Sequence, residues 1–192
     1  MGYQLLDANG STIVNKDLQN KGFWCQHGLS KEQIFVATFG EKFGVILNPD
    51  KEKDPYVPDL FQTYDRRLAD LKTQNTPLFQ AQQRYNINPQ YAVTFNLKDY
   101  ERYMNIYGGN VAIYFCVEWI PTTFVSSSGQ RISVKSMKGV WWTDMFRLQD
   151  LVKTAPVHSY QQRVHDTKGN AKASYVFDLT SSAFTRLVYN GL

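Results

Sequence analysis

Two carboxylates and a lysine stand close together in the sequence, in a pattern suited to metal chemistry. Asp59 follows a proline, and the triplet Asp70-Leu71-Lys72 begins 11 residues after it. Carboxylate oxygens suit Mg²⁺, which takes few protein ligands and keeps several waters. A lysine beside such an ion can orient or polarise an attacking water. These residue types predict metal-assisted phosphodiester hydrolysis, with Asp59, Asp70 and the Leu71 carbonyl as metal ligands.

A β-hairpin over residues 57–73 would bring these groups together. Pro58 favours an extended conformation at the preceding residue, so residues 57–61 are predicted to be extended. A turn at 64–66 leads to a strand at 68–73. Side chains alternate along a strand, so Asp70 and Lys72 should share one face of the returning strand.

Neither half of this motif is specific alone. An acid-x-Lys triplet also occurs at Asp166-Thr167-Lys168, and a second Pro-Asp occurs at Pro49-Asp50. The former reads as a turn and the latter leads into a charged loop. Only Pro58-Asp59 and residues 70–72 lie in expected strands joined by one turn. These strands follow, in the sequence, an expected helix that carries an acid.

That helix is predicted to begin at Ser30, where Ser30 and Gln33 form a capping-box pattern. It should end at Gly40 or Gly44. Two of its acids could complete the site, Glu32 or Glu41. Glu32 is preferred, because it lies inside the helix and precedes the apolar Phe35.

The rest of the chain predicts an α/β or α+β fold around a mixed sheet flanked by helices, with a β-rich C-terminal part. Residues 1–29 read as irregular, and a strand–helix–strand crossover over 91–119 implies at least one parallel pairing. The expected elements are strands at 45–47, 91–95, 111–119 and 174–177, one or two strands within 131–142, and helices at 97–106 and 144–152.

Length and composition indicate one domain. The chain has 192 residues, and its two cysteines cannot make a disulfide framework or a zinc-finger set. No apolar run is long enough to span a membrane, and the N-terminus lacks the pattern of a signal peptide. A cytoplasmic protein is therefore expected.

Charge is unevenly distributed along the chain. Residues 1–60 hold 6 Lys and Arg against 8 Asp and Glu, whereas residues 121–192 hold 9 against 4. Such a layout suits an anionic polymer held against a metal site, although each basic stretch could be an ordinary solvated loop. The candidate nucleic-acid contacts in these basic stretches are Arg131, Lys135, Lys138, Arg163, Lys168, Asn170 and Lys172.

With these residues, segment 30–75 resembles the PD-(D/E)XK nuclease superfamily, whose pattern is a helical Glu, a strand with Asp and a strand with acid-x-Lys. Here these would be Glu32, Asp59, Asp70 and Lys72. Some members carry a Gln shortly after the Lys, so the resemblance also implies Gln74, two residues beyond Lys72, as a nucleic-acid contact. The resemblance implies a restriction-endonuclease-like core over about 30–120, with a basic nucleic-acid-contacting part over 121–192.

The resemblance also implies an activity. It predicts a Mg²⁺-dependent endonuclease acting on duplex DNA, with Mn²⁺ as a substitute cation. A type II restriction-type enzyme is the first expectation, and a recombination or Holliday-junction nuclease of phage or host comes next. Cutting both strands favours a homodimer. The alternatives are a nucleic-acid-binding protein that does not cleave and a protein-interaction module with a basic surface.

Overall fold

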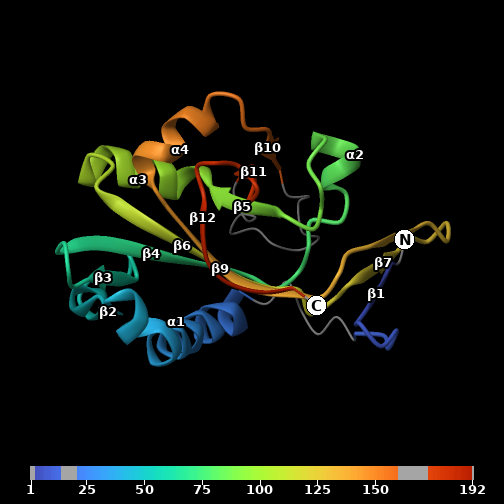
Figure 1. The fold of residues 1–192 in the computed structure, drawn as a ribbon, viewed down its shortest axis with the longest axis horizontal. Coiled ribbons are helices and arrows are strands. Elements are labelled where there is room, and N and C mark those ends of the chain that lie inside the picture. The colour runs from blue at the N-terminus through green and yellow to red at the C-terminus, as the bar shows by residue number, and fades with distance from the viewer. Residues whose placement is uncertain (1–2, 14–20, 160–172, 192) are drawn as a thin grey trace.

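The computed structural model describes residues 3–13, 21–159 and 173–191. Its centre is a six-stranded mixed sheet in the order β12-β9-β6-β4-β3-β2 (Figure 1). Only β4 and β6 pair in parallel among these neighbours; the other pairings are antiparallel. The strands are β2 (Val45–Leu47), β3 (Leu60–Gln62), β4 (Arg67–Gln74), β6 (Val111–Glu118), β9 (Met137–Asp144) and β12 (Thr185–Gly191).

Helices and a second sheet cover the two faces of the central sheet (Figure 1). Helix α1 (Lys21–Phe43) lies on one face. Helices α3 (Leu97–Tyr107) and α4 (Met145–Val152) lie on the other, together with a three-stranded sheet, β10-β11-β5. Its strands are β10 (Val157–His158), β11 (Ser174–Asp178) and β5 (Ala92–Asn96).

The remaining described elements are short. A third sheet, β1-β7-β8, extends from one end of the molecule (Figure 1). It contains β1 (Gln4–Leu6), β7 (Thr123–Val125) and β8 (Arg131–Ser133). Helix α2 (Ala81–Tyr85) and a 3-10 helix, η1 (Pro49–Glu52), complete the fold. No helix within the described ranges is long and apolar enough to cross a membrane.

The hydrophobic core is divided by the central sheet. On the α3 and α4 side, Phe95 packs near Phe115 and Phe177. On the α1 side, Phe35 packs near Tyr114. Strand β6 contributes side chains to both clusters, which explains why its sequence is a nearly continuous apolar run.

The structure confirms the mixed α+β fold and most of the expected elements. The hairpin over 57–73 is present as β3 and β4. The strands at 45–47, 91–95, 111–119 and 174–177 and the helix at 97–106 are present with small changes of boundary. Two strands, β8 and β9, lie within or overlap 131–142. Helix α4 begins after Asp144, whose carboxylate accepts a hydrogen bond from the Arg147 N–H.

The predicted start of the first helix was wrong. Helix α1 begins at Lys21, so Ser30 lies inside it rather than at its N-terminus, and residues 4–6 form β1 instead of irregular structure. A capping box is a local signal, and serine inside a helix costs only a few tenths of a kcal/mol relative to better helix formers. The helix therefore continues upstream through Ser30.

The parallel pairing expected within the strand–helix–strand unit at 91–119 was also wrong. Strand β5 pairs antiparallel with β11 in the second sheet, and the parallel neighbour of β6 is β4. Both edges of β6 are occupied, by β4 and β9, so β5 packs over the sheet instead of joining it. Periodicity identifies a strand but carries no information about its partner.

The C-terminal third is divided among all three sheets. Strands β9 and β12 come from residues beyond 120 and extend the central sheet. The basic part expected over 121–192 thus shares a sheet with the part that carries Asp59 and Asp70.

Candidate active site

The candidate site lies where β3 and β4 separate. The two strands pair only through residues 60–62 and 67–69, with Leu60 opposite Ala69. Continuing this antiparallel register puts Asp59 opposite Asp70, one step beyond the last pair. Opposite residues in such a ladder share a face, so the two carboxylates belong to one face of the hairpin.

The backbone at Asp59 is fixed by the neighbouring segment. Asn48 follows β2, and its backbone N–H donates to the Asp59 carbonyl at 2.9 Å. The Asn48 side-chain amide donates to the Pro58 carbonyl at 2.8 Å. The same side chain caps η1 by accepting from the Asp50 N–H at 3.1 Å. Asn48 therefore positions Asp59 and η1 together.

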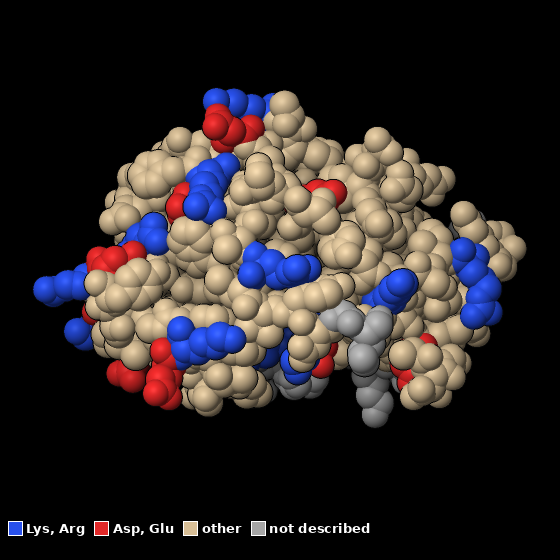
Figure 2. Space-filling view, viewed as in Figure 1, with Lys and Arg blue, Asp and Glu red and all other residues tan. Residues whose placement is uncertain are grey.

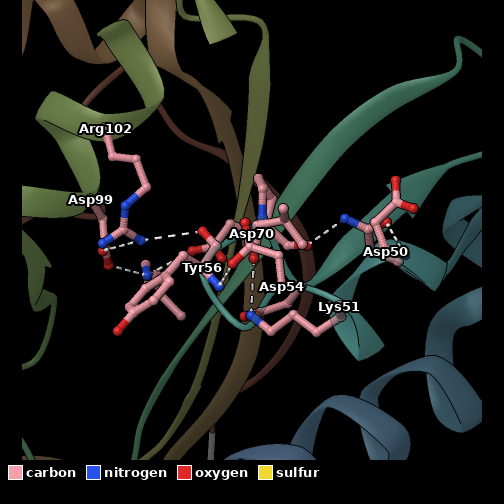
Figure 3. Close-up of polar contacts among 12 residues, drawn as sticks. Asp50, Lys51, Asp54, Tyr56, Asp70, Asp99 and Arg102 are labelled. Atoms are coloured by element: carbon pink, nitrogen blue, oxygen red, sulfur yellow. Dashed lines mark hydrogen bonds and ion pairs between the residues drawn. The ribbon is translucent and has the colours of Figure 1, made fainter. Parts of the chain in front are cut away.

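An ammonium group contacts each of the two carboxylates. Lys51, from η1, forms an ion pair with Asp59, and its Nζ also donates to the Val57 carbonyl at 3.0 Å. Lys72 Nζ lies 2.7 Å from Asp70 Oδ2. Figure 3 shows Lys51 approaching the cluster from the β2–β3 side of the molecule. The site is therefore a cluster of alternating charges rather than a group of acids alone.

A third carboxylate, Asp99, shares Lys72 with Asp70. Lys72 Nζ donates to Asp99 Oδ2 at 2.6 Å. Asp99 lies in the first turn of α3, where a negative charge interacts favourably with the helix dipole. Arg102 Nη1 lies 3.5 Å from Asp99 Oδ1, on the α3 side of the cluster (Figure 3).

Arg102 also ties α3 to the loop that precedes Asp59. Its Nη1 donates to the Tyr56 carbonyl at 3.3 Å, and its guanidinium lies 5.4 Å from the centre of the Tyr56 ring. The segment from 54 to 58, which we term the strap, is therefore held by Lys51 at Val57 and by Arg102 at Tyr56.

Aromatic side chains enclose Lys72 from the core side. Its Nζ lies 5.6 Å from the centre of the Phe95 ring and 5.9 Å from that of Tyr103. The Asp70 side chain is 3% exposed and that of Asp59 12%, whereas those of Lys51 and Lys72 are 22% and 23% exposed. A ligand from solvent would thus meet the ammonium groups before Asp70.

Burial and charge shift the proton affinities of the central pair. Burial raises the pKa of Asp70; the Lys72 ammonium opposes this rise and the Asp59 carboxylate adds to it. Burial alone would lower the pKa of Lys72, but Asp70 and Asp99 outweigh it and hold that pKa well above its usual value. Lys72 is therefore a cation, and ionised Asp70 is held at an energetic cost.

Of the two helical acids considered, the structure brings Glu32 to the site. Burial raises the pKa of Glu32, while Lys51 and a contact with the Asp59 side chain lower it in part, and the charges of Asp70 and Lys72 also act on it. Glu41 is exposed on the last turns of α1. The structure thus brings Glu32, Asp59, Asp70 and Lys72 close enough for their charges to influence one another.

The oxygen atoms of Asp59 and Asp70 are of the kind that magnesium ions bind. Asp70 Oδ2 is buried, and no donor among the described residues is aligned to hydrogen-bond with it, although Lys72 lies close. Over the same ranges, no three Asp, Glu, His or Cys side chains are grouped closely enough to form a metal centre by themselves. Mg²⁺ is commonly bound through one or two carboxylates, with water and substrate phosphate as the other ligands. Asp59 and Asp70 can supply those two carboxylates, and the Leu71 backbone lies between Asp70 and Lys72 on β4.

Gln74, a predicted nucleic-acid contact, faces the protein interior. Its Oε1 accepts from the Thr94 N–H at 3.1 Å, and its Nε2 donates to the carbonyls of Thr76 and Ala92 at 3.0 and 3.3 Å. Gln74 thus connects β4 to β5, and its side chain is already used for hydrogen bonding.

Three other predicted contacts lie at a distance from Asp70. Arg131 is exposed on β8, and Lys135 is exposed beside Gln90, which hydrogen-bonds to its backbone. Lys138 is 60% exposed and lies 3.3 Å from Glu118. Since Glu118 follows Ile113, the neighbour of Asp70, by five residues, Lys138 is about 17 Å along the sheet from Asp70.

Basic side chains are dispersed over the visible surface. On the face in Figure 2, Lys and Arg form separate groups among uncharged residues. Four predicted contacts lie outside the described residues: Arg163, Lys168, Asn170 and Lys172.

Sequence reasoning missed Lys51, Asp99 and Arg102. Asp99 carried a weak signal, since an acid in the first turn of a helix is common and also stabilising. Lys51 lies in a loop rich in charges, where nothing in the residue pattern distinguishes it from Lys53. Their roles depend on how η1 and α3 pack against the hairpin.

Comparisons with protein-family models, with curated proteins and with solved structures found no match to this chain.

Proposed function

We propose that this protein is a Mg²⁺-dependent endonuclease of the PD-(D/E)XK type that hydrolyses DNA. The observation that carries the proposal is the convergence of Glu32, Asp59, Asp70 and Lys72 from α1, the start of β3 and β4. The order of these residues and elements is that of the superfamily's motif. A restriction-endonuclease-like fold is part of the same proposal.

Each residue has a role that follows from its surroundings. Asp59 and Asp70 would hold the cation, with the Leu71 carbonyl as a further ligand. When bound, the cation would polarise the scissile phosphate and lower the pKa of a water ligand. Lys72 remains protonated because Asp70 and Asp99 stabilise its charge. Its ammonium would orient the attacking water and stabilise the negative charge that develops on the phosphate. Glu32 would accept a hydrogen bond from water at the edge of the site.

The proposed substrate is duplex DNA, cut by a homodimer in the manner of a type II restriction-type enzyme. One cluster per chain can cut one strand, so symmetric cutting of both strands requires a second copy related by a two-fold axis. A recombination or junction nuclease would use the same cluster on a branched substrate.

The test is cleavage of supercoiled and linear plasmid with Mg²⁺ or with EDTA. We expect cutting only with the metal, and a loss of at least about 100-fold in rate for Lys72→Ala, the scale seen when one charge-stabilising donor is removed. Lys98→Ala is the matched control, because Lys98 is an exposed lysine on α3 beside Asp99.

The fragments distinguish the subclasses of nuclease. Discrete fragments would identify a sequence-specific enzyme, and cutting restricted to a four-way junction would identify a junction nuclease. If no plasmid, junction or RNA is cut under any divalent metal while DNA still binds in a salt-dependent manner, the protein is a nucleic-acid-binding protein without cleavage.

A further inference from the structure

The Lys51–Asp59 ion pair is not part of the motif that defines the proposed site. Lys51 comes from η1, eight residues before Asp59, and its Nζ contacts both the Asp59 carboxylate and the Val57 carbonyl. Its ammonium therefore lies between the Asp59 carboxylate and the Val57 carbonyl of the strap. A cation held by a carboxylate and a backbone carbonyl is also a common arrangement for a bound metal ion.

We propose that Lys51 is a built-in competitor for the metal ion, which must displace the Lys51 ammonium from Asp59 in order to bind there. The inference rests on the proposed function in that Asp59 is taken as a metal ligand. It assigns to Lys51 the setting of metal affinity, a role separate from that of Lys72.

The two lysines of the cluster differ in how firmly they are held. Lys72 has two carboxylate partners, Asp70 and Asp99, and two aromatic rings within 6 Å. Lys51 has one carboxylate and one carbonyl among its described partners. The two side chains are exposed to the same degree, 22% and 23%, so the number of partners is what distinguishes them. A partly exposed ion pair with a single carboxylate contributes little to stability. Lys51 is therefore the ammonium that an incoming cation can replace.

The surrounding charges give a reason for such a competitor. Without a cation at Asp59, its carboxylate would act on Glu32 and Asp70 with no positive charge beside it, and the charge of Asp59 already raises the pKa of Asp70. Lys51 supplies a positive charge at this position in the metal-free protein. The consequence is a lower apparent affinity for metal, since binding must include the loss of the Lys51 contact.

Lys51 also links metal binding to the strap. Because the same Nζ donates to the Val57 carbonyl, its displacement would remove one of the contacts that hold the strap beside η1. Arg102 would still hold Tyr56 on the α3 side. The Asn48 amide would still hold the Pro58 carbonyl, so the strap would lose its attachment at Val57 alone.

The test measures Mn²⁺ binding to the full chain without DNA, by calorimetry or by the electron paramagnetic resonance of free Mn²⁺. Lys51→Met removes the charge and keeps most of the side chain, and should bind Mn²⁺ about 10-fold more tightly than the original protein. Lys51→Arg keeps the charge and should bind within about 3-fold. Lys53→Met is the matched control for net charge, being exposed on the same loop, and should also bind within about 3-fold.

The outcomes separate this inference from the proposed function. Unchanged or weaker Mn²⁺ binding by folded Lys51→Met overturns the role of Lys51, even if the original protein cuts DNA. Tighter binding by Lys51→Met supports it, even if no DNA is cut and the nuclease proposal fails. An absence of Mn²⁺ binding by every variant overturns both. Circular dichroism of Lys51→Met and Lys51→Arg establishes that each variant is folded before its affinity is interpreted.

Discussion

Two polar side chains on the same face of β4, the buried Asp70 and the half-buried Gln74 at the C-terminal end, have very different surroundings. At the C-terminal end, Gln74 has both its amide oxygen and its amide nitrogen in hydrogen bonds with the backbone of neighbouring segments. At the Asp70 end, the carboxylate is buried, its pKa is raised, and within the described residues Oδ2 lacks an aligned donor. A hydrogen-bonded amide such as Gln74 connects segments of a fold, whereas a carboxylate whose ionised form is disfavoured by burial, even beside Lys72, adds a cost that function can justify.

The neighbours of each end explain this difference. Beyond Ala69, β3 no longer pairs with β4, so Asp70 lies at an opening between strands. Gln74 lies where β5 of the second sheet crosses the central sheet, and it satisfies the Thr94 N–H there. The same strand therefore builds an open charged end and a closed structural end four residues apart.

The largest expected effect is the loss of activity in Asp70→Asn. An amide keeps the shape of the carboxylate but cannot supply the negative charge that a divalent cation requires. We expect cleavage in Mg²⁺ to fall by at least about 10³-fold, the order seen for groups at the centre of a catalytic site. The rate is measured under single-turnover conditions, with Asp150→Asn, an exposed acid on α4, as the control.

That variant should stay folded, because Lys72 keeps Asp99 as a partner. Activity close to that of the original protein would show that Asp70, like Gln74, has a structural role. The proposed functional difference between these two residues of β4 would then be wrong.

The second prediction concerns the other end of β4. Gln74→Leu would leave the part-buried Thr94 N–H without its side-chain acceptor, and a fully buried donor left unpaired costs about 1–3 kcal/mol. Since this donor is only part-buried, we expect the free energy of unfolding in urea to fall by about 1 kcal/mol. The cleavage rate of the folded protein should change by less than about 3-fold. Gln83→Leu, an exposed glutamine of α2, should leave stability within about 0.5 kcal/mol.

A different result would support the original prediction that Gln74 contacts nucleic acid. If Gln74→Leu kept its stability and bound DNA more weakly at the same salt concentration, Gln74 would be a nucleic-acid contact rather than a link between sheets.

The third prediction tests whether Asp99 acts through Lys72. Asp99→Asn weakens the hydrogen bond that holds the Lys72 ammonium, and supporting groups of this kind are typically worth 10–100-fold. We expect kcat to fall about 10-fold with KM changed by less than 2-fold, and Asp99→Glu to recover part of the loss.

Glu101→Gln is the control for this series, since Glu101 is an exposed acid on the same helix. A rise in KM without a change in kcat would contradict a positioning role, because it would indicate an effect on substrate binding alone.

Much of this site could be predicted from sequence because its motif is local. Asp59, Asp70 and Lys72 lie within one hairpin, and alternation along β4 determines which of them share a face. Glu32 is also near in sequence, on the helix that leads into β2. In each case a short segment with a strong periodic pattern carries the information.

What could not be predicted depends on contacts between distant segments. Asp99 contacts Lys72, which lies 27 residues earlier in the chain. Gln74 contacts Thr94 because β5 pairs with β11 in the second sheet, which packs over the central sheet. A residue's own sequence neighbourhood does not specify such partners. The same limit explains the error in the pairing of β5, whose pattern as a strand was nonetheless correct.

The smallest expected effect concerns stability as a function of pH in metal-free solution. Burial and the Asp59 charge raise the folded-state pKa of Asp70. The folded protein therefore holds the Asp70 proton more tightly than the unfolded chain does. The unfolding free energy is highest below the unfolded-state pKa of about 4 and falls as pH rises through the folded-state pKa, because the buried carboxylate then ionises. Asp70→Asn stays neutral and escapes this loss.

We therefore expect the two proteins to unfold at similar temperatures near pH 4 and to diverge as pH increases, with Asp70→Asn the more stable at pH 8. A gain of about 1 kcal/mol would raise the midpoint of unfolding by about 2–4 °C for a chain of this size. Thermal unfolding monitored by circular dichroism in EDTA measures this, with Asp150→Asn as the control. If instead Asp70→Asn became the less stable protein as pH rose, the Lys72 ion pair would outweigh the burial of Asp70, and the two ends of β4 would both be structural.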